Sequence, residues 1–160
     1  MSIGFVVVVI GESIRFWGVA YAGSLTRVTG SVGAPEVIMS GPFAYVRNPI
    51  YVGNILTYIG IGIMANAFFP WLVLIATVWF CFQYYQIVIL EESFLEKEFD
   101  SIYLEFKRKV PRFIPRLSAY VNPIQSKQLS SWKEALHSER RTFQALSLVL
   151  VILLVLWYAR

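Results

Sequence analysis

The sequence predicts an all-α integral membrane protein, a single domain over residues 1–160 with about four transmembrane helices. Hydrophobic residues make up 57% of the chain and charged residues only 15%, whereas soluble domains average about 25% charged residues. Four apolar runs approach the roughly 20 residues that a helix needs to cross a bilayer. These runs are Ile3–Tyr21, Pro49–Asn66, Phe68–Leu90 and Phe143–Tyr158.

The second and third runs predict a tight helical hairpin, because only Ala67 separates them and Pro70 follows directly. Basic residues indicate the orientation of this hairpin. Arg27 and Arg47 precede it, most other lysines and arginines lie between the third and fourth runs, and the turn itself has none. Cytoplasmic segments carry the excess of lysine and arginine. We therefore expect the long connections in the cytoplasm and the hairpin turn on the opposite side.

The segment Glu91–Val110 predicts a cytoplasmic amphipathic helix that lies against the membrane or over the hairpin. Its apolar residues recur at helical spacing: Leu95, Phe99, Ile102 and Phe106. Pro111 and Pro115 end this helix, because proline forces extended backbone before it.

The rest of the chain reads as a polar linker, Ser118–Ser131, then a short interfacial helix, Trp132–Arg141, and the last span. Trp157, Tyr158 and Arg160 are expected to anchor that span at the interface.

The low numbers of cysteine and histidine exclude some classes of function. Cys81 is the single cysteine, so no disulfide forms within the chain, and we expect it to be a small buried apolar side chain. His137 is the single histidine, which excludes a multi-histidine metal site, and we expect no metal. The net charge of +4 indicates orientation and anionic headgroups in a membrane protein. No pattern of a nucleic-acid-binding module is present.

Two charged residues lie inside the first span, where charge is costly and often functional. Glu12 and Arg15 are three residues apart and share one helical face. They form either an ion pair near the membrane surface or a polar patch in which Arg15 holds an anionic group. An arginine fork suits a carboxylate or a phosphate better than lysine does.

A polar motif opens the second span. Pro49 can occupy the first position of a helix, which leaves free backbone N–H groups that could bind a ligand. Arg47 and Asn48 precede it and Tyr51 lies one turn into the helix, although a basic residue before a span can also be only a topology signal. Gly53 permits close approach of a partner helix or of a ligand.

An acidic pair, Glu91 and Glu92, ends the third span. Adjacent helical residues point about 100° apart, so at most one can lie squarely in a pocket. The pair is either a solvated helix end or part of a site. Because this helix pairs with the one that opens at Pro49, a ligand bearing a cation and hydroxyls could be held from two helices at once.

The order of these motifs is similar to that of the isoprenylcysteine carboxyl methyltransferase family, a relative of the membrane phospholipid N-methyltransferases. The motifs are Gly11-Glu12-Ser13-Ile14-Arg15 with Ala22-Gly23-Ser24, Gly41-Pro42 with Arg47-Asn48-Pro49-Ile50-Tyr51-Val52-Gly53, Glu91-Glu92, and Tyr103, Phe106 and Val110-Pro111. The resemblance covers about residues 11–115, and the C-terminal linker and extra helix, 118–160, lie outside it.

The resemblance implies S-adenosylmethionine as the cofactor, bound at the cytoplasmic ends of the helices. The implied cofactor contacts are Tyr45, Val46, Arg47, Asn48, Pro49, Tyr51, Gly53, Glu91 and Glu92. Arg15 is implied to face a substrate carboxylate, and Glu92 or Glu12 would act as a base toward an amine. Asn48 stands where many members have histidine, and asparagine cannot carry a proton.

The expected activity is methylation of a lipidic or prenylated substrate from the bilayer, with O-methylation of a carboxylate favoured. The alternatives are N-methylation of an ethanolamine phospholipid, a relative of the sterol reductases that use a nicotinamide cofactor, and a non-catalytic small membrane subunit. We expect a multi-pass protein with its active site on the cytoplasmic side and with membrane lipids as neighbours. The sequence leaves the oligomeric state open.

Overall fold

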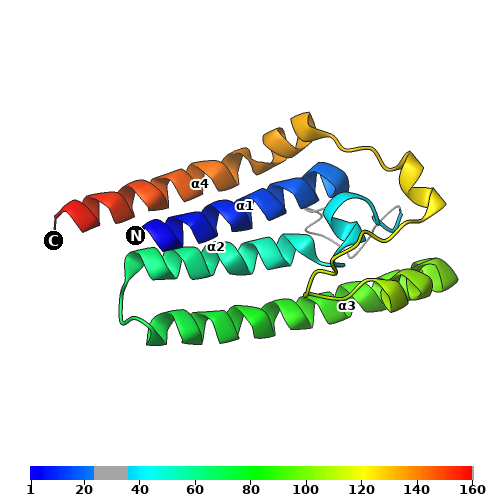
Figure 1. The fold of residues 1–160 in the computed structure, drawn as a ribbon, viewed down its shortest axis with the longest axis horizontal. Helices are drawn as coiled ribbons and strands as arrows, with labels where there is room; N and C mark the ends of the chain where they lie inside the picture. The colour runs from blue at the N-terminus through cyan, green and yellow to red at the C-terminus, as the bar shows by residue number, and fades with distance from the viewer. Residues whose placement is uncertain (24–35, 160) are drawn as a thin grey trace.

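The computed structural model describes residues 1–23 and 36–159. These residues form four α-helices that lie side by side, α1 (Ser2–Ala22), α2 (Pro49–Ala65), α3 (Trp71–Lys109) and α4 (Trp132–Tyr158), with short 3-10 helices η2 (Gly41–Ala44) and η3 (Pro123–Lys127) (Figure 1). Three residues used in the sequence analysis lie outside the described residues: Ser24 of the family motif, Arg27 of the orientation argument and Arg160 of the interfacial anchor.

The predicted fold class is confirmed. In the described part of the chain every regular element is helical, and α1, α3 and α4 are long and apolar enough to cross a membrane. The 17 residues of α2 form a shorter apolar helix, which at 1.5 Å per residue spans about 26 Å, close to the ~30 Å hydrocarbon core. Both ends of the chain lie at the end of the bundle where the α2–α3 turn lies (Figure 1).

Two helices are longer than the sequence pattern predicts. The amphipathic segment Glu91–Val110 is not a separate helix but continues α3, which has 39 residues and departs from helical dihedrals at Asp100 (φ 35°, ψ −113°). The interfacial segment that begins at Trp132 likewise continues into the last span as α4. Neither stretch contains glycine or proline, so the backbone stays helical where the pattern changes from apolar to amphipathic. In α3 the break comes nine residues later, at Asp100.

Glycines bring α1 and α2 into direct backbone contact. A Cβ atom at Gly60 would lie 2.6 Å from the carbonyl oxygen of Gly4, and one at Gly53 would lie 2.6 Å from that of Gly11. The two contacts are seven residues apart on each helix, which keeps them on one face of the antiparallel pair. The expectation of close approach at Gly53 is thus met by a partner helix.

The predicted α2–α3 hairpin is present. α2 ends at Asn66, which has the left-handed conformation (φ 51°) and donates its N–H to the carbonyl of Gly62, as residues that end helices commonly do. Aromatic rings then join the two helices: Tyr58 lies 4.2 Å from Phe80, centroid to centroid. Cys81 is exposed on the outer surface of α3, so the prediction that it is buried is wrong. Its face of the helix is turned away from the bundle, and in a membrane that surface meets lipid.

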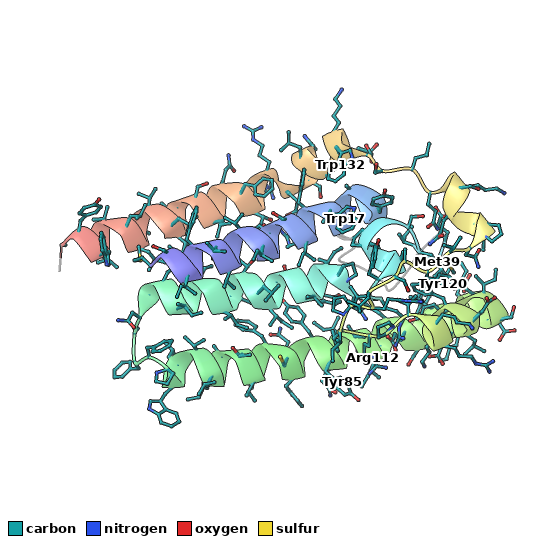
Figure 2. All side chains as sticks on the ribbon, in the orientation of Figure 1. Trp17, Met39, Tyr85, Arg112, Tyr120 and Trp132 are labelled. Atoms are coloured by element: carbon teal, nitrogen blue, oxygen red, sulfur yellow. The ribbon has the colours of Figure 1, made fainter. Side chains whose placement is uncertain are left out.

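At the other end of the bundle, the two long connections pack against the far half of α3. A buried apolar cluster joins them: Val37, Met39, Tyr103, Phe106, Val110 and Tyr120. Figure 2 shows Met39 and Tyr120 together at this end. Backbone hydrogen bonds run from the N–H of Arg116 to the carbonyl of Tyr45 (3.0 Å) and from the N–H of Tyr120 to that of Ala44 (2.9 Å). The connection after α3 therefore lies directly beside the segment that leads into α2.

α4 is attached to α1 mainly near its own start. The N–H of Ser131 donates to the carbonyl of Ala20 (2.8 Å), and Ala135 is buried against Val19 and Ala20. The ring of Phe16 lies 5.6 Å from that of Trp132. Beyond this region α4 is exposed, because none of its most apolar 18-residue window is buried.

Candidate functional site

A buried ion-pair cluster joins the segment before α2 to the middle of α3. Glu92 is 3% exposed, and its Oε1 accepts hydrogen bonds from Nε (3.0 Å) and Nη2 (2.9 Å) of Arg47. Its Oε2 accepts from Nη2 of Arg112 at 2.6 Å. Two guanidinium groups thus share one carboxylate, which offsets the cost of burying its charge.

Arg47 also holds the end of α3. Its Nη1 donates to the carbonyl oxygens of Lys107 (3.0 Å) and Val110, and its backbone N–H donates to the carbonyl of Pro111 (2.9 Å). The last carbonyls of a helix have no partner within the helix and carry partial negative charge. A cation placed there satisfies them and fixes the connection that follows.

Arg112 comes from that connection and lies partly exposed beside α3. Its guanidinium lies 5.3 Å from the ring centre of Tyr85, a cation–π distance that can be followed in Figure 2. The hydrogen bond to Glu92 raises the pKa of Arg112 above its usual value, against the opposing effect of burial. Sequence reasoning missed Arg112 as a site residue, because it followed a proline in what looked like an irregular basic segment.

The second acid contacts α2 one turn further along. The hydroxyl of Tyr51 donates to Oε1 of Glu91 at 2.6 Å, and its ring lies 4.8 Å from that of Tyr84, which receives a hydrogen bond from Asn54 (3.2 Å). Asn48 donates its side-chain amide to the carbonyl of Arg112 (3.1 Å). Both acids of the pair therefore contact the segment from residue 47 to residue 51, each through its own partner.

Other residues implied as cofactor contacts serve the packing around this cluster. Pro49 occupies the start of α2, as predicted. Val46 is 3% exposed, and the ring of Tyr45 lies 6.3 Å from that of Trp17 on α1. Gly53 faces α1. The structure thus places the polar members of the set together and puts these four at the start of α2 and against α1.

A second charged cluster lies between α1, α2 and α4. Nη1 of Arg15 is 3.6 Å from Oε2 of Glu12 and forms a closer ion pair with Glu139 of α4. Oε1 of Glu12 accepts a hydrogen bond from the hydroxyl of Thr57 on α2 (3.1 Å). The predicted Glu12–Arg15 pair is present, but its stronger partner comes from a helix outside the resemblance.

Glu139 was missed because it lies in a basic stretch that looked interfacial. A signal was available, since Glu139 is seven residues from the start of α4 and Arg15 is seven residues from the end of α1. Both of those helix ends lie at the same end of the bundle, so the opposite charges lie at the same depth. Tyr84, whose ring lies 4.8 Å from that of Tyr51, accepts a hydrogen bond from Asn54 of α2 beside the first cluster.

Comparison with known proteins identifies relatives over two thirds to three quarters of the chain. The chain is 29% identical over 120 residues to the cobalt-zinc-cadmium resistance protein CzcN of Cupriavidus metallidurans, which covers 75% of this chain and 51% of that protein. It is 26% identical over 120 residues to the nickel-cobalt-cadmium resistance protein NccN of Alcaligenes xylosoxydans xylosoxydans, covering 75% of this chain and 52% of that protein.

A third relative carries an enzyme name. The chain is 28% identical over 109 residues to the protein-S-isoprenylcysteine O-methyltransferase of Schizosaccharomyces pombe, covering 66% of this chain and 45% of that protein. This similarity agrees with the resemblance noted from the motifs. The chain spans about half the length of the curated relatives it matches. No solved structure matches it.

The chain also matches the model of a family. The model of the phospholipid methyltransferase family matches residues 1–101, which include α1, α2 and most of α3 with both acids of the pair. The family resemblance predicted from the motifs is therefore confirmed, and the chain belongs to the phospholipid methyltransferase family.

Proposed function

We propose that this protein transfers a methyl group from S-adenosylmethionine to a lipidic substrate that enters from the bilayer. One observation carries the proposal: in a chain of this family, the contacts Arg47–Glu92 and Tyr51–Glu91 join the start of α2 to the middle of α3. Carboxylates, guanidinium groups and aromatic rings thus meet where an apolar helix pair ends.

The residues present fit the methyl donor chemically. Its sulfonium and amino groups are cationic, and the carboxylate of Glu91 beside the rings of Tyr51 and Tyr84 suits a cation. Arg112 keeps a quarter of its side chain exposed (27%) and suits the donor's carboxylate. Asn48 offers an amide to hydroxyls or to the base.

Other members of the cluster would act on these contacts rather than touch the donor. Arg47 is engaged by Glu92 and by the carbonyls at the end of α3, so we propose that it fixes Glu92 and the connection. Tyr45, Val46, Pro49 and Gly53 would shape the start of α2 and its packing on α1.

Catalysis by these residues would rest on positioning. The donor supplies a methyl group already activated by the sulfonium charge. The protein must align an acceptor with it and exclude water, and neither task requires a metal or a covalent intermediate. A carboxylate acceptor needs no base, and Arg15 would orient it.

An amine acceptor is the second candidate, favoured by the family match and by the second carboxylate in the Arg15 cluster. An amine must lose a proton, and an acid that is held by two arginines is a poor base. Of the two acids considered for this role, Glu92 has both guanidinium groups, which leaves Glu12 for the amine chemistry.

The active site would face the cytoplasm. The cluster lies at the end of the bundle that has the two long connections, and most of the basic residues lie in those connections or in the adjoining parts of α3 and α4. The donor would then arrive from water and the lipid from the side.

The test is incubation of the purified chain in detergent with S-adenosylmethionine labelled on its methyl group and a total lipid extract. We expect label in the organic phase, released by mild base if the product is an ester and retained if it is an amine. Heat-unfolded protein is the control.

Lack of lipid labelling, together with no thermal stabilisation by S-adenosylmethionine, would contradict the proposal. Stabilisation by NADPH instead would point to a reductase. Stabilisation by neither would point to a non-catalytic subunit.

A further inference from the structure

We propose that Glu139 is an internal competitor for the guanidinium of Arg15, so that a lipid carboxylate binds Arg15 by displacing Glu139. That this carboxylate belongs to the methyl acceptor rests on the proposed function, but the exchange of one carboxylate for another at Arg15 does not. The inference assigns a role to α4, which lies outside the family match of residues 1–101.

The partners of Arg15 differ in strength. Glu12 lies at 3.6 Å, beyond hydrogen-bond distance, and its other oxygen is occupied by the hydroxyl of Thr57. Glu139 makes the closer ion pair. The strongest occupant of the guanidinium is therefore a carboxylate from α4, the same chemical group that an acidic lipid would present.

Access to the two groups also differs. The side chain of Glu139 is 1% exposed, whereas that of Arg15 is 14% exposed. Part of the Arg15 side chain is thus open to an incoming group, while Nη1, the nitrogen that faces Glu139, is buried. A second carboxylate therefore reaches Nη1 only as Glu139 withdraws from it.

The packing of α4 allows Glu139 to withdraw. Apart from Glu139, the helix is held near its start by Ala135 and by contacts of Phe16 with Trp132 and with Phe143 (5.7 Å). Its most apolar window has no buried residue, against 33% for α1. If α4 tilts about its start, its exposed part would contact lipid both before and after the movement, so little packing against the other helices would be lost.

The exchange conserves charge at Arg15. A carboxylate replaces a carboxylate, while Glu139 lies about 10 Å from the start of α4 and can move toward water. Without the internal carboxylate, an incoming one no longer has to displace a charged competitor. Removing Glu139 should therefore strengthen lipid carboxylate binding about tenfold.

The test uses the whole 160-residue chain in non-ionic detergent, titrated calorimetrically with oleate and with methyl oleate as the uncharged probe. We expect Glu139→Gln to bind oleate about tenfold more tightly than the parent, with methyl oleate unchanged. Arg15→Gln should lose the preference for oleate over its ester. Glu98→Gln, a change at an exposed acid on α3, should match the parent.

Two results would overturn the inference: unchanged or weaker oleate binding by folded Glu139→Gln, or equal gains for oleate and its ester. If Glu139→Gln does not fold, Glu139→Asp is used instead, because it keeps the charge but shortens the side chain. The shorter carboxylate should compete less well for Arg15, so oleate should bind more tightly to Glu139→Asp than to the parent. Equal affinity in that variant would also overturn it.

This experiment separates the inference from the proposed function. If oleate binding follows the expected order but no lipid is ever methylated, the proposed function fails and the inference stands. If a lipid is methylated but oleate binding ignores Glu139, the inference fails alone.

Discussion

Replacing Arg47 by glutamine should destabilise the protein more than the same replacement at Arg112. Arg47 is 8% exposed and donates to Glu92 and to two carbonyls at the end of α3, whereas Arg112 is 27% exposed. Removing one partner of a buried ion pair costs about 3–5 kcal/mol. Because Arg112 would still neutralise Glu92, we expect the lower value, about 3 kcal/mol, for Arg47→Gln, and about 1 kcal/mol for the more exposed Arg112.

The assay heats the detergent-solubilised protein and then measures the remaining monodisperse fraction by size-exclusion chromatography with tryptophan fluorescence. The midpoint is the temperature at which half of the protein remains monodisperse. Glu92→Gln combined with Arg47→Gln should cost less than the sum of the single changes, because the double variant leaves no buried carboxylate without its main partner. A midpoint for Arg47→Gln equal to or above that of Arg112→Gln would refute the reasoning.

Three further predictions follow from single contacts. Tyr51→Phe removes the hydrogen bond to Glu91 and should weaken S-adenosylhomocysteine binding about tenfold in calorimetric titration; equal affinity would count against the donor site. Arg15→Ala should leave that affinity unchanged but abolish lipid methylation, and loss of donor binding would instead place Arg15 beside the donor. Gly60→Ala should lower the thermal midpoint by the equivalent of about 1–3 kcal/mol because its Cβ meets a backbone carbonyl at 2.6 Å, whereas at Gly62 it meets a valine methyl at 3.0 Å and should cost less.

The helices and their order could be predicted from the sequence because they depend on local properties. Apolar runs of membrane length, a turn of a few residues and Pro49 at a helix start are each visible within a short window. The spacing of glycines also predicted close approach, although not which partner would approach. The end of a helix is harder to predict than its existence. At Glu91 the sequence changes from apolar to amphipathic, but the helix continues.

Only part of the candidate site could be predicted, because some of its residues stand out in the sequence and others do not. The acids and the segment from Arg47 to Tyr51 stood out because charged and proline-containing motifs are rare in apolar helices. Arg112 and Glu139 lie in basic segments where a single charge carries no signal, and their partners are 20 and 124 residues away. Such pairs depend on how the connections pack, for example through hydrogen bonds between Gln128 and Val37.

The length of α3 sets the depth at which the reaction would occur. At 1.5 Å per residue its 39 residues measure about 58 Å, nearly twice a ~30 Å hydrocarbon core. The rise from Trp71 to Glu91 is about 30 Å, so if α3 enters the hydrocarbon core at Trp71, the acid pair would lie at the opposite edge of that core. A lipid could present its polar group there while its acyl chains stay in the bilayer, and a methyl donor from the aqueous phase would reach it without entering the hydrocarbon core.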